Sequence, residues 1–269
     1  MIPARLIRPD FAPGSVWLAG AGPGDPGLLT LHALDALERA EVVLHDALVP
    51  PEILALAATP RRIAVGKRAG GVRTQQLRIN QMLIAEARAR HRVLRLKGGD
   101  PLLFGRGAEE ALALVAAGIP FRIIPGVSAG LGGTATAGIP LTHRGLAQSV
   151  AFVTGQDRAG GLPALGDLAR GADTLVFYMA RRQAGAIAAA LLAAGRAPED
   201  AAVFIAEATT ARQRVSETTL AGAAALAATL PAVPTLLVTG KVTALRPILL
   251  RLLHAAPMTL APRDAALTA

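Results

Sequence analysis

The sequence predicts an α/β protein built from two units. Short apolar runs alternate with stretches of helical periodicity over most of the 269 residues, a pattern typical of parallel βαβ units with right-handed crossovers. Loops rich in glycine and proline follow three of the apolar runs, at 20–27, 98–101 and 125–130. The length allows two medium-sized domains, and the third loop is the expected hinge between them.

The first unit follows an arm, residues 1–14, which is irregular, bears prolines and is expected to be loose. Strands are expected at 16–20, 41–45, 62–65, 93–97 and 121–124, and helices at 28–39, 51–58, 74–90 and 108–117. Thr74 is the expected cap of the third helix, and acidic residues occupy the first turn of the fourth.

The second unit begins with a helix of small residues at 131–137. Strands are expected at 149–154, 174–179, 202–206 and 235–239, with helices between them, of which 181–194 is the clearest. Residues 213–218 alternate between polar and apolar side chains and predict an antiparallel strand. The last residues, 256–269, are expected to be a frayed tail.

The composition excludes several classes of protein. The absence of cysteine rules out disulfides, thiolate nucleophiles and sulfur-ligated metals, and it suits the reducing cytoplasm. The first ten residues lack the apolar core of a signal peptide, and the most apolar helix, 184–194, is too short to span a bilayer. His143 has no partner histidines at metal-ligand spacing. We therefore expect a soluble protein with no membrane partner and no metal.

The formal charge of +9 favours an anionic partner, and all basic residues are arginines except Lys67, Lys97 and Lys241. The chain has no basic run, no set of stacking aromatics and no nucleic-acid motif, so we do not expect it to bind nucleic acid. The planar guanidinium group also suits carboxylates, which makes a small polycarboxylate an alternative partner. A codon bias towards arginine and alanine would explain the excess equally well.

The first glycine loop raises the alternative of a nicotinamide-dependent oxidoreductase. The stretch Gly22–Gly27 matches G-x-G-x-x-G after a predicted strand, and Asp46 ends the next strand where a ribose-binding acid belongs. However, Pro23 and Pro26 remove two of the backbone N–H groups that a pyrophosphate needs. The sequence therefore disfavours this alternative.

Several spaced blocks of the sequence are distinctive. They are Val16-Trp-Leu-Ala-Gly-Ala-Gly-Pro-Gly-Asp-Pro-Gly-Leu-Leu-Thr30, Val42-Val-Leu-His-Asp-Ala-Leu-Val49, Val65-Gly-Lys-Arg68, Arg95-Leu-Lys-Gly-Gly-Asp-Pro101, Phe104-Gly-Arg-Gly107, Pro125-Gly-Val-Ser-Ala129 and Gly138-Ile-Pro-Leu-Thr-His-Arg144. Together they resemble the signatures of the tetrapyrrole methylase family, from about residue 15 to 248. Sister enzymes that act on a later corrin intermediate, or on protein or RNA, share several blocks and remain an alternative.

The resemblance implies a class III methyltransferase fold, with αβα domains at 15–125 and 126–255. It also implies a cytoplasmic homodimer that binds S-adenosylmethionine in the trough between the domains and methylates a tetrapyrrole. Carried over by position, the cofactor would contact Pro23, Gly98, Gly99, Asp100, Leu103, Ser128, Ala129, Met179, Ala208 and Thr235. Asp100 would neutralise the ammonium group or accept a hydrogen bond from a hydroxyl. For Met179, packing in the core is the alternative.

The resemblance further implies that Asp46 is a proton acceptor and Lys67 a proton donor. The alternatives are a helix N-cap for Asp46 and a solvated loop charge for Lys67. Arg106, His143 and Arg144 flank the expected trough and are assigned to the carboxylates of the substrate, with ordinary surface positions as the alternative.

Overall fold

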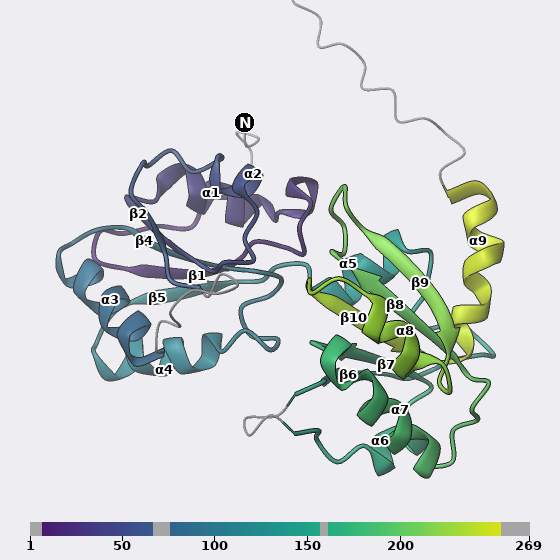
Figure 1. Ribbon diagram of the computed structural model, residues 1–269. Helices are drawn as coiled ribbons and strands as arrows, with labels where there is room; N and C mark the ends of the chain where they lie inside the picture. The colour runs from purple at the N-terminus through teal and green to yellow at the C-terminus, as the bar shows by residue number, and fades with distance from the viewer. Residues whose placement is uncertain (1–6, 67–75, 157–160, 254–269) are drawn as a thin grey trace, which may run out of the picture.

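The computed structural model describes residues 7–66, 76–156 and 161–253, which form two five-stranded sheets with helices on both faces (Figure 1). The first sheet takes its strands from residues 16–124 and the second from 150–239. The predicted α/β class with two layered units is therefore confirmed. The exact domain limits, 15–125 and 126–255, stay a prediction.

All five strands of the first sheet run parallel, in the order β3-β2-β4-β1-β5. The strands are β1 (Val16–Gly20), β2 (Val42–His45), β3 (Arg62–Ala64), β4 (Val93–Lys97) and β5 (Phe121–Ile124), and the helices are α1 (Leu31–Arg39), α2 (Pro51–Leu54), α3 (Gln76–Arg88) and α4 (Gly107–Ala116). Since parallel strands end at the same edge, the loops after β1, β4 and β5 leave the sheet together.

Both faces of the first sheet are buried. Trp17 and Leu94 face α1 and α2, whereas Leu18 and Leu44 face α3 and α4. This explains why the strands are continuous apolar runs, because each side chain along a strand alternates between two helical layers. Two helices are shorter than predicted: α2 is a single turn, and α1 begins after Thr30, whose hydroxyl accepts from the third N–H of the helix.

The second sheet is mixed, in the order β6-β7-β10-β8-β9. Its strands are β6 (Val150–Thr154), β7 (Thr174–Tyr178), β8 (Ala201–Ala206), β9 (Arg214–Thr219) and β10 (Thr235–Thr239). Only β6 and β7 pair in parallel, so the expected parallel pattern is wrong for the rest of this sheet. The antiparallel strand predicted at 213–218 is confirmed as β9, which pairs with β8 after a connection too short for a crossover helix.

Helices of small residues cover the second sheet. Three of them, α6 (Gly166–Gly171), α7 (Ala184–Ala193) and α8 (Ala223–Thr229), pack on one face around Phe177 and Phe204. The helix α5 (Ala129–Thr136) packs on the other face. The final helix, α9 (Arg246–Leu253), follows the 3-10 turn Lys241–Leu245. None of the helices in the described residues has the length and apolar character that a bilayer span requires.

The described part of the N-terminal arm is docked, which corrects the expected loose arm for residues 7–14. Phe11 is buried, and its ring stacks on Trp17 with the ring centroids 4.2 Å apart. The guanidinium of Arg39 lies 5.9 and 5.7 Å from the two ring centroids and donates to the carbonyl of Pro9 at 2.9 Å. Stacking and cation–π contacts explain why this irregular segment is ordered.

Candidate active site

The loops after β1, β4 and β5 meet at one edge of the first sheet. Gly22 and Gly99 exchange two backbone hydrogen bonds, of 3.2 and 2.7 Å. A Cβ on Gly20 would lie 2.4 Å from the carbonyl oxygen of Gly99 and 2.6 Å from the Cα of Gly126, so only glycine fits there. The predicted convergence of the three glycine loops is confirmed.

Asp100 ties two of these loops together. Its Oδ1 accepts from the N–H of Leu102 at 2.8 Å, and its Oδ2 accepts from the N–H of Gly126 at 3.1 Å. Each carboxylate oxygen can accept a further hydrogen bond. The geometry is therefore compatible with the expected contact to an ammonium group or a hydroxyl of the cofactor, which stays a prediction.

Gly99 borders open space. The backbone φ is +67°, and the nearest atoms to an added Cβ would be the backbone of Ser128 and Ala129, 3.9 Å away. By contrast, a Cβ on Gly98 would lie 3.2 Å from the side chain of Leu48. A small molecule could lie directly against the Gly99 backbone, between this loop and the start of α5.

Tyr178 joins the second half of the molecule to this space. The hydroxyl accepts from the N–H of Gly130 at 2.8 Å and shares a hydrogen bond with the hydroxyl of Ser128. Burial raises the pKa of Tyr178, because it disfavours the phenolate. The ring centroid lies 5.0 Å from that of Phe104, which comes from the loop after β4. Tyr178 therefore links loops from both halves.

Backbone strain concentrates in the same loops. Six non-glycine residues of the described chain have positive φ, and five of them lie in the loops after β4, β7 and β8: Phe104, Arg106, Met179, Glu207 and Thr209. Residues in this conformation persist where their surroundings enforce it, and they cluster at ligand sites. The hydroxyl of Thr209 also accepts from the N–H of Asp25 at 3.1 Å, which joins the loops after β8 and β1.

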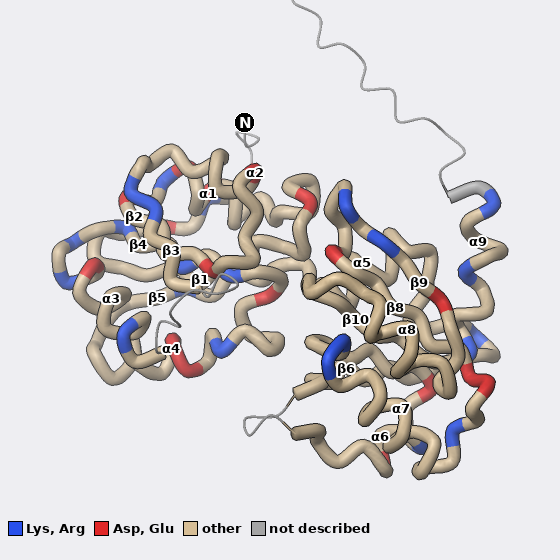
Figure 2. Tube along the Cα trace, in the orientation of Figure 1, with Lys and Arg blue, Asp and Glu red and all other residues tan. Residues whose placement is uncertain are grey.

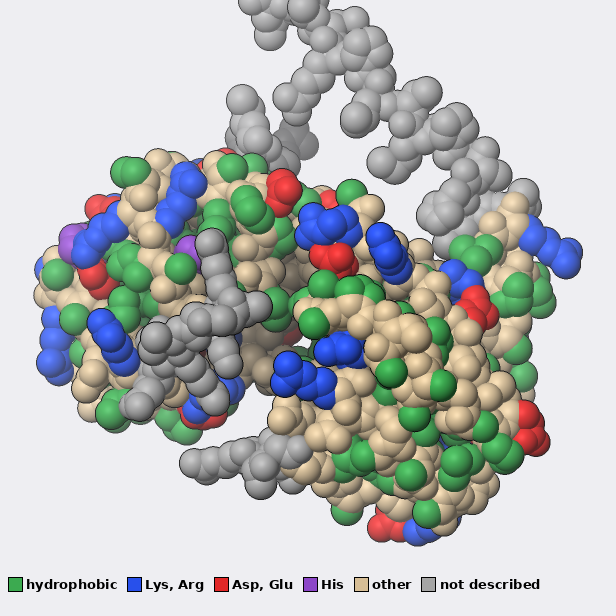
Figure 3. All heavy atoms as spheres, viewed as in Figure 1, with side chains coloured by type: hydrophobic (Ala, Val, Ile, Leu, Met, Phe, Trp, Pro, Cys, Tyr) green, Lys and Arg blue, Asp and Glu red, His purple; other side chains and the backbone are tan. Residues whose placement is uncertain are grey.

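A cavity of about 260 Å³ opens beside Met179 on the second half. It is lined by Gln156, Met179, Arg181, Arg182, Ala232, Val233, Pro234 and Thr235. Figure 3 shows that the molecular surface is hollowed between the two halves. The Met179 side chain is 53% exposed, so it does not pack in the core. Two of the residues expected at the cofactor, Met179 and Thr235, thus share one cavity.

Pro23 and Ala208 lie against the glycines of α5. A Cβ on Gly132 would be 2.9 Å from the ring of Pro23, and one on Gly133 would be 2.7 Å from the Cβ of Ala208. The absence of side chains at Gly132 and Gly133 lets the loops of both halves approach this helix. Ala208 is buried, and its contact with the cofactor stays a prediction. Leu103 is half-buried in the loop after β4.

Asp46 follows β2 at the same edge of the sheet. Its side chain is 28% exposed, it forms an ion pair with Arg95, and its Oδ2 lies 3.9 Å from the Nζ of Lys97. The first helix after it, α2, begins at Pro51 and is preceded by Pro50 as its N-cap, so the alternative of a cap on α2 does not apply. The position agrees with the expected one, and the role as proton acceptor stays a prediction.

Behind Asp46 lie charged groups that the sequence did not single out as site residues. Glu110 is fully buried, and its Oε1 accepts from the Nε of Arg95 and the Nζ of Lys97, each at 3.1 Å. Burial lowers the pKa of Lys97, and repulsion by Arg95 lowers it further. The sequence shows Arg95 and Lys97 at alternate positions of the strand, but it does not show that the face carrying them is buried.

Lys67, the predicted proton donor, lies outside the described residues. Gly66, which precedes it, packs against the loop after β2: an added Cβ would lie 2.1 Å from the backbone nitrogen of Ala47. The chain therefore leaves β3 beside Asp46.

Arg106 begins α4 from the loop that also carries Phe104. Its backbone is left-handed, with φ of 59°, and its guanidinium donates to both carboxylate oxygens of Glu109, at 2.8 and 2.6 Å. This hydrogen-bonded pair raises the pKa of Arg106. A substrate carboxylate would compete with Glu109 for the exposed guanidinium.

His143 and Arg144 lie at the other end of the second sheet. The loop that holds them precedes β6, whereas Met179 follows the far end of β7, and the two strands run in parallel. A strand of this length separates the two ends by roughly 13 Å. The structure does not bring these two residues together with the glycine loops, and their assignment to the substrate stays a prediction.

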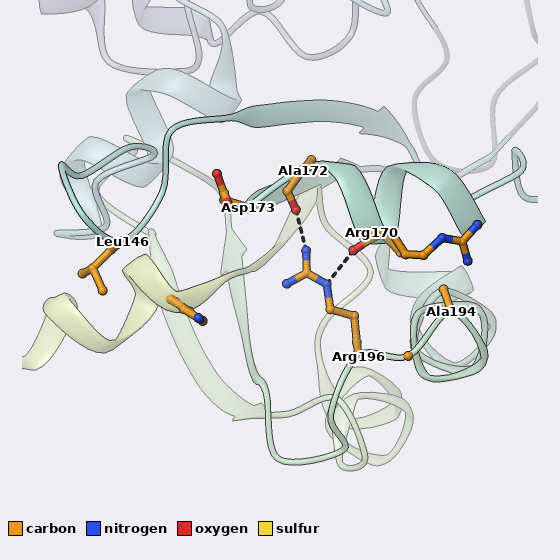
Figure 4. Close-up of a pocket in the computed structure, with 9 residues that line it drawn as sticks. Leu146, Arg170, Ala172, Asp173, Ala194 and Arg196 are labelled. Atoms are coloured by element: carbon orange, nitrogen blue, oxygen red, sulfur yellow. Dashed lines mark hydrogen bonds between the residues drawn. The ribbon is translucent and has the colours of Figure 1, made fainter.

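Another cavity, of about 330 Å³, lies at this opposite end of the sheet (Figure 4). It is lined by Leu146, Ala169, Arg170, Ala172, Asp173, Ala194, Gly195, Arg196 and Lys241. Arg196 donates to two backbone carbonyls at the end of α6, and Asp173 accepts from the N–H groups of Gln148 and Ser149. The hydrogen bond from Gln148 and those from Ser149 lower the pKa of Asp173. Arg196 and Asp173 thus bind backbone groups at the end of α6 and before β6, which is a structural role.

Most backbone N–H groups that a dinucleotide would need in the first glycine loop are missing, at Pro23 and Pro26, or already bonded. The N–H of Gly22 donates to Gly99, that of Gly27 donates to the carboxylate of Asp25 at 2.7 Å, and Thr30 caps α1. The oxidoreductase alternative therefore loses its structural basis. No group of three metal-ligating side chains occurs in the part of the chain that the structure describes.

Comparisons with known proteins agree with this geometry. The family profile of the tetrapyrrole (corrin/porphyrin) methylases matches residues 15–224. A uroporphyrinogen-III C-methyltransferase from Sinorhizobium sp is 50% identical over 243 residues, which cover 88% of this chain and 87% of that protein. A siroheme synthase from Tolumonas auensis is also 50% identical, but the chain spans only 52% of its length.

Solved structures show the same fold. The uroporphyrin-III C-methyl transferase from Thermus thermophilus, complexed with S-adenyl homocysteine, matches with a TM-score of 0.77 and 41% identity over 86% of this chain and 99% of that chain. A cobalt precorrin-4 methyltransferase matches with a TM-score of 0.74 at 24% identity and supports the fold alone. The chain belongs to the tetrapyrrole (corrin/porphyrin) methylase family.

Proposed function

We propose that this chain transfers methyl groups from S-adenosylmethionine to carbons 2 and 7 of uroporphyrinogen III, which gives precorrin-2. The observation that carries the proposal is the 50% identity to a uroporphyrinogen-III C-methyltransferase over most of both chains. The product would serve the synthesis of sirohaem or cobalamin.

The residues around Gly99 fit the cofactor. A Cβ at this position would enter open space that the start of α5 borders, and Met179 offers an exposed apolar contact. Asp100 supplies carboxylate oxygens for a cationic group. The expected contacts of Pro23, Gly98, Leu103, Ser128, Ala129, Ala208 and Thr235 belong to the same proposal. When bound, S-adenosylmethionine supplies an electrophilic methyl group on its sulfonium.

The chemistry needs orientation more than activation, because the pyrrole carbons of the substrate are already nucleophilic. In each step the ring carbon forms a bond to the methyl carbon, the carbon–sulfur bond breaks, and S-adenosylhomocysteine leaves with the electron pair. The residues around the space between Gly99 and the start of α5 would hold the attacking ring carbon in line with the methyl carbon and the sulfur, and they would exclude water.

Asp46 would accept the proton that the macrocycle loses as its double bonds shift. The pairing with Arg95 and the proximity of Lys97 counter the charge of the carboxylate and hold it at the sheet edge. Lys67 would return a proton to the macrocycle. Arg106, and with less geometric support His143 and Arg144, would bind carboxylates of the substrate.

We also propose that the chain acts in the cytoplasm as a homodimer. Apolar side chains are exposed on helices of both halves, including Leu112 and Val115 of α4 at 69% and 62% and Leu131 of α5 at 50%. A second copy of the chain could cover such surfaces. Light scattering at micromolar protein should return twice the chain mass, and a monomer mass would contradict the proposal.

One assay tests the activity. The purified chain is mixed anaerobically with uroporphyrinogen III and S-adenosylmethionine, and the mass of the product is measured by mass spectrometry. The proposal expects two added methyl groups and two equivalents of S-adenosylhomocysteine. Methylation of precorrin-2 but not of uroporphyrinogen III would instead support a sister enzyme of the pathway.

A further inference from the structure

Four charged side chains form what we name the buried charge cluster: Asp46, Arg95, Lys97 and Glu110. Arg95, Lys97 and Glu110 are 1%, 2% and 0% exposed, and Asp46 alone reaches the surface. The cluster holds two cations and two anions. It lies at the carboxyl ends of β2 and β4, where the loops of the candidate active site begin.

Glu110 is the hub of the cluster. Its Oε1 accepts three hydrogen bonds of 3.1 Å, from the Nε of Arg95, the Nζ of Lys97 and the Nε2 of Gln76. Its Oε2 is buried and has no hydrogen-bond partner among the described residues. The Glu110 carboxylate therefore accepts hydrogen bonds from both Arg95 and Lys97, and Asp46 forms ion pairs with the same two side chains.

Arg95 transmits the position of Glu110 to Asp46. The guanidinium donates through Nε to Glu110 and through Nη2 to Asp46, and its Nη1 donates to the backbone carbonyl of Leu96 at 3.2 Å. A guanidinium is planar and rigid, so fixing one edge fixes the other. The Asp46 carboxylate is thus held by a group whose own position depends on a residue inside the core.

Burial of this cluster has no evident purpose in folding. The other residues on this face of β1, β2 and β4 are aliphatic, and well-packed apolar side chains usually stabilise a core as much as buried ion pairs do. The presence of buried charges at these positions therefore favours a requirement for geometry at the one exposed member, Asp46.

We propose that Glu110 is a positioning residue, which holds Arg95 and Lys97 so that they orient the carboxylate of Asp46 towards the substrate. This inference rests on the proposed function, in which Asp46 accepts a proton. Burial and Arg95 lower the pKa of Lys97, whereas the carboxylates of Asp46 and Glu110 oppose this lowering, as expected for two anions that hold the lysine in the cluster. Without Glu110, two buried cations would repel each other beside Asp46.

A double-mutant cycle tests the proposal. The full chain is compared with Glu110→Gln, Asp46→Asn and the double variant, and kcat, the KM of each substrate and the Kd of S-adenosylhomocysteine are measured. If Glu110 acts through Asp46, Glu110→Gln lowers kcat about 10- to 100-fold with unchanged cofactor affinity, but it has almost no effect in the Asp46→Asn background. Asp46→Asn by itself lowers kcat about 10²- to 10⁴-fold.

Equal kcat losses in both backgrounds, or none in either, would overturn the proposal. The pH profile of kcat should also change shape in Glu110→Gln, since the ionisable groups that face Asp46 from β4 lose their shared partner. Glu86→Gln is the matched control, because Glu86 also pairs with two basic groups, Arg61 and His91, but far from the cluster. It should leave kcat unchanged.

If Glu110→Gln does not fold, the same cycle is run with Arg95→Lys, which keeps the charge but cannot span both carboxylates. A wild-type chain that methylates no tetrapyrrole would refute the proposed function itself. An active wild type with an additive cycle refutes only the inference. The two failures are therefore distinguishable.

Discussion

The two halves of the molecule contribute to the candidate active site in different ways. In the first half, a parallel sheet brings the carboxyl ends of β2 and β4 side by side, and charged groups such as Asp46 gather there. In the second half, the mixed sheet presents the ends of β7 and β8 and the start of β10, which carry Met179, Thr209 and Thr235. Figure 2 shows the two halves with their charged residues marked. The charged groups to which we assign the chemistry therefore lie in the first half, whereas loops of both halves shape the space assigned to the cofactor.

The largest expected effect lies in the first half. Asp46→Asn keeps the size of the side chain but cannot accept a proton, so turnover should fall about 10²- to 10⁴-fold. S-adenosylhomocysteine should bind normally, as calorimetry would measure. Turnover close to wild type would remove Asp46 from the catalytic residues and weaken the assignment of chemistry to this half.

A smaller effect is expected where the first half supplies shape. Gly99→Ala would place a Cβ in the space assigned to the cofactor, and binding of S-adenosylhomocysteine should weaken by about 1–3 kcal/mol. Gly118→Ala is the matched control, because Gly118 has the same φ of +67° and nothing within 4 Å of an added Cβ. Both variants carry the same backbone strain, so equal affinities would show that Gly99 does not contact the cofactor.

The third prediction separates two arginines by their position. Arg106→Ala should raise the KM for the tetrapyrrole about tenfold, near the lower limit for a hydrogen bond to a charged group, because Glu109 already shares this guanidinium. Arg144→Ala, at the opposite end of the second sheet, should raise the KM less than Arg106→Ala does, because the structure places Arg144 away from the glycine loops. Steady-state kinetics with saturating S-adenosylmethionine measure both. The reverse result would place substrate binding in the second half.

The smallest effect concerns the second half. Tyr178→Phe removes the acceptor of the Gly130 N–H, which should lower the free energy of unfolding by about 1 kcal/mol and weaken cofactor binding a few-fold. The chain has one tyrosine, so tyrosinate absorbance reports its titration directly. Titration at or below the ordinary tyrosine pKa would contradict the described burial.

The raised pKa of Tyr178 also gives a pH dependence of definite sign. The folded chain keeps the phenolic proton at a pH where the unfolded chain has lost it, so this contribution to stability is complete below about pH 10 and is lost above it. Between pH 9.5 and 11, wild type should therefore lose more stability than Tyr178→Phe in urea unfolding. An identical loss in both proteins would contradict this account.

The sequence was sufficient for most of the fold and for part of the candidate site. The glycine loops were predictable because a Cβ added at Gly20 or Gly126 would lie within 3 Å of neighbouring backbone atoms, so these positions admit only glycine and leave a pattern in the sequence. The mixed strand order of the second sheet was not predictable. The direction of a strand depends on the path of the connection that precedes it, and the periodicity of the sequence does not specify that path. The docking of Phe11 was missed for a similar reason, since its partner Trp17 contributes no local signal.

The burial of Glu110 and its contacts with Arg95 and Lys97 could not be predicted from the sequence either. An acidic residue in the first turn of a helix is explained adequately by the helix dipole, so nothing in the local sequence indicates that this one is buried against Arg95 and Lys97. A strand with charges at alternate positions usually has one face in water. Only the helices on both faces of the first sheet show that these charges must find partners inside.

The burial of the charge cluster has a consequence for the behaviour of the enzyme in salt. Mobile ions screen charges in water within about a Debye length, roughly 8 Å at physiological ionic strength, but they cannot enter a packed interior. The attraction between Arg95 and Glu110 should therefore persist at high ionic strength, whereas the attraction of an anionic substrate to the exposed Arg106 should weaken. Added salt would then raise the KM for the tetrapyrrole while kcat stays nearly constant. Substrate binding would therefore depend on ionic strength, whereas the chemical step would not.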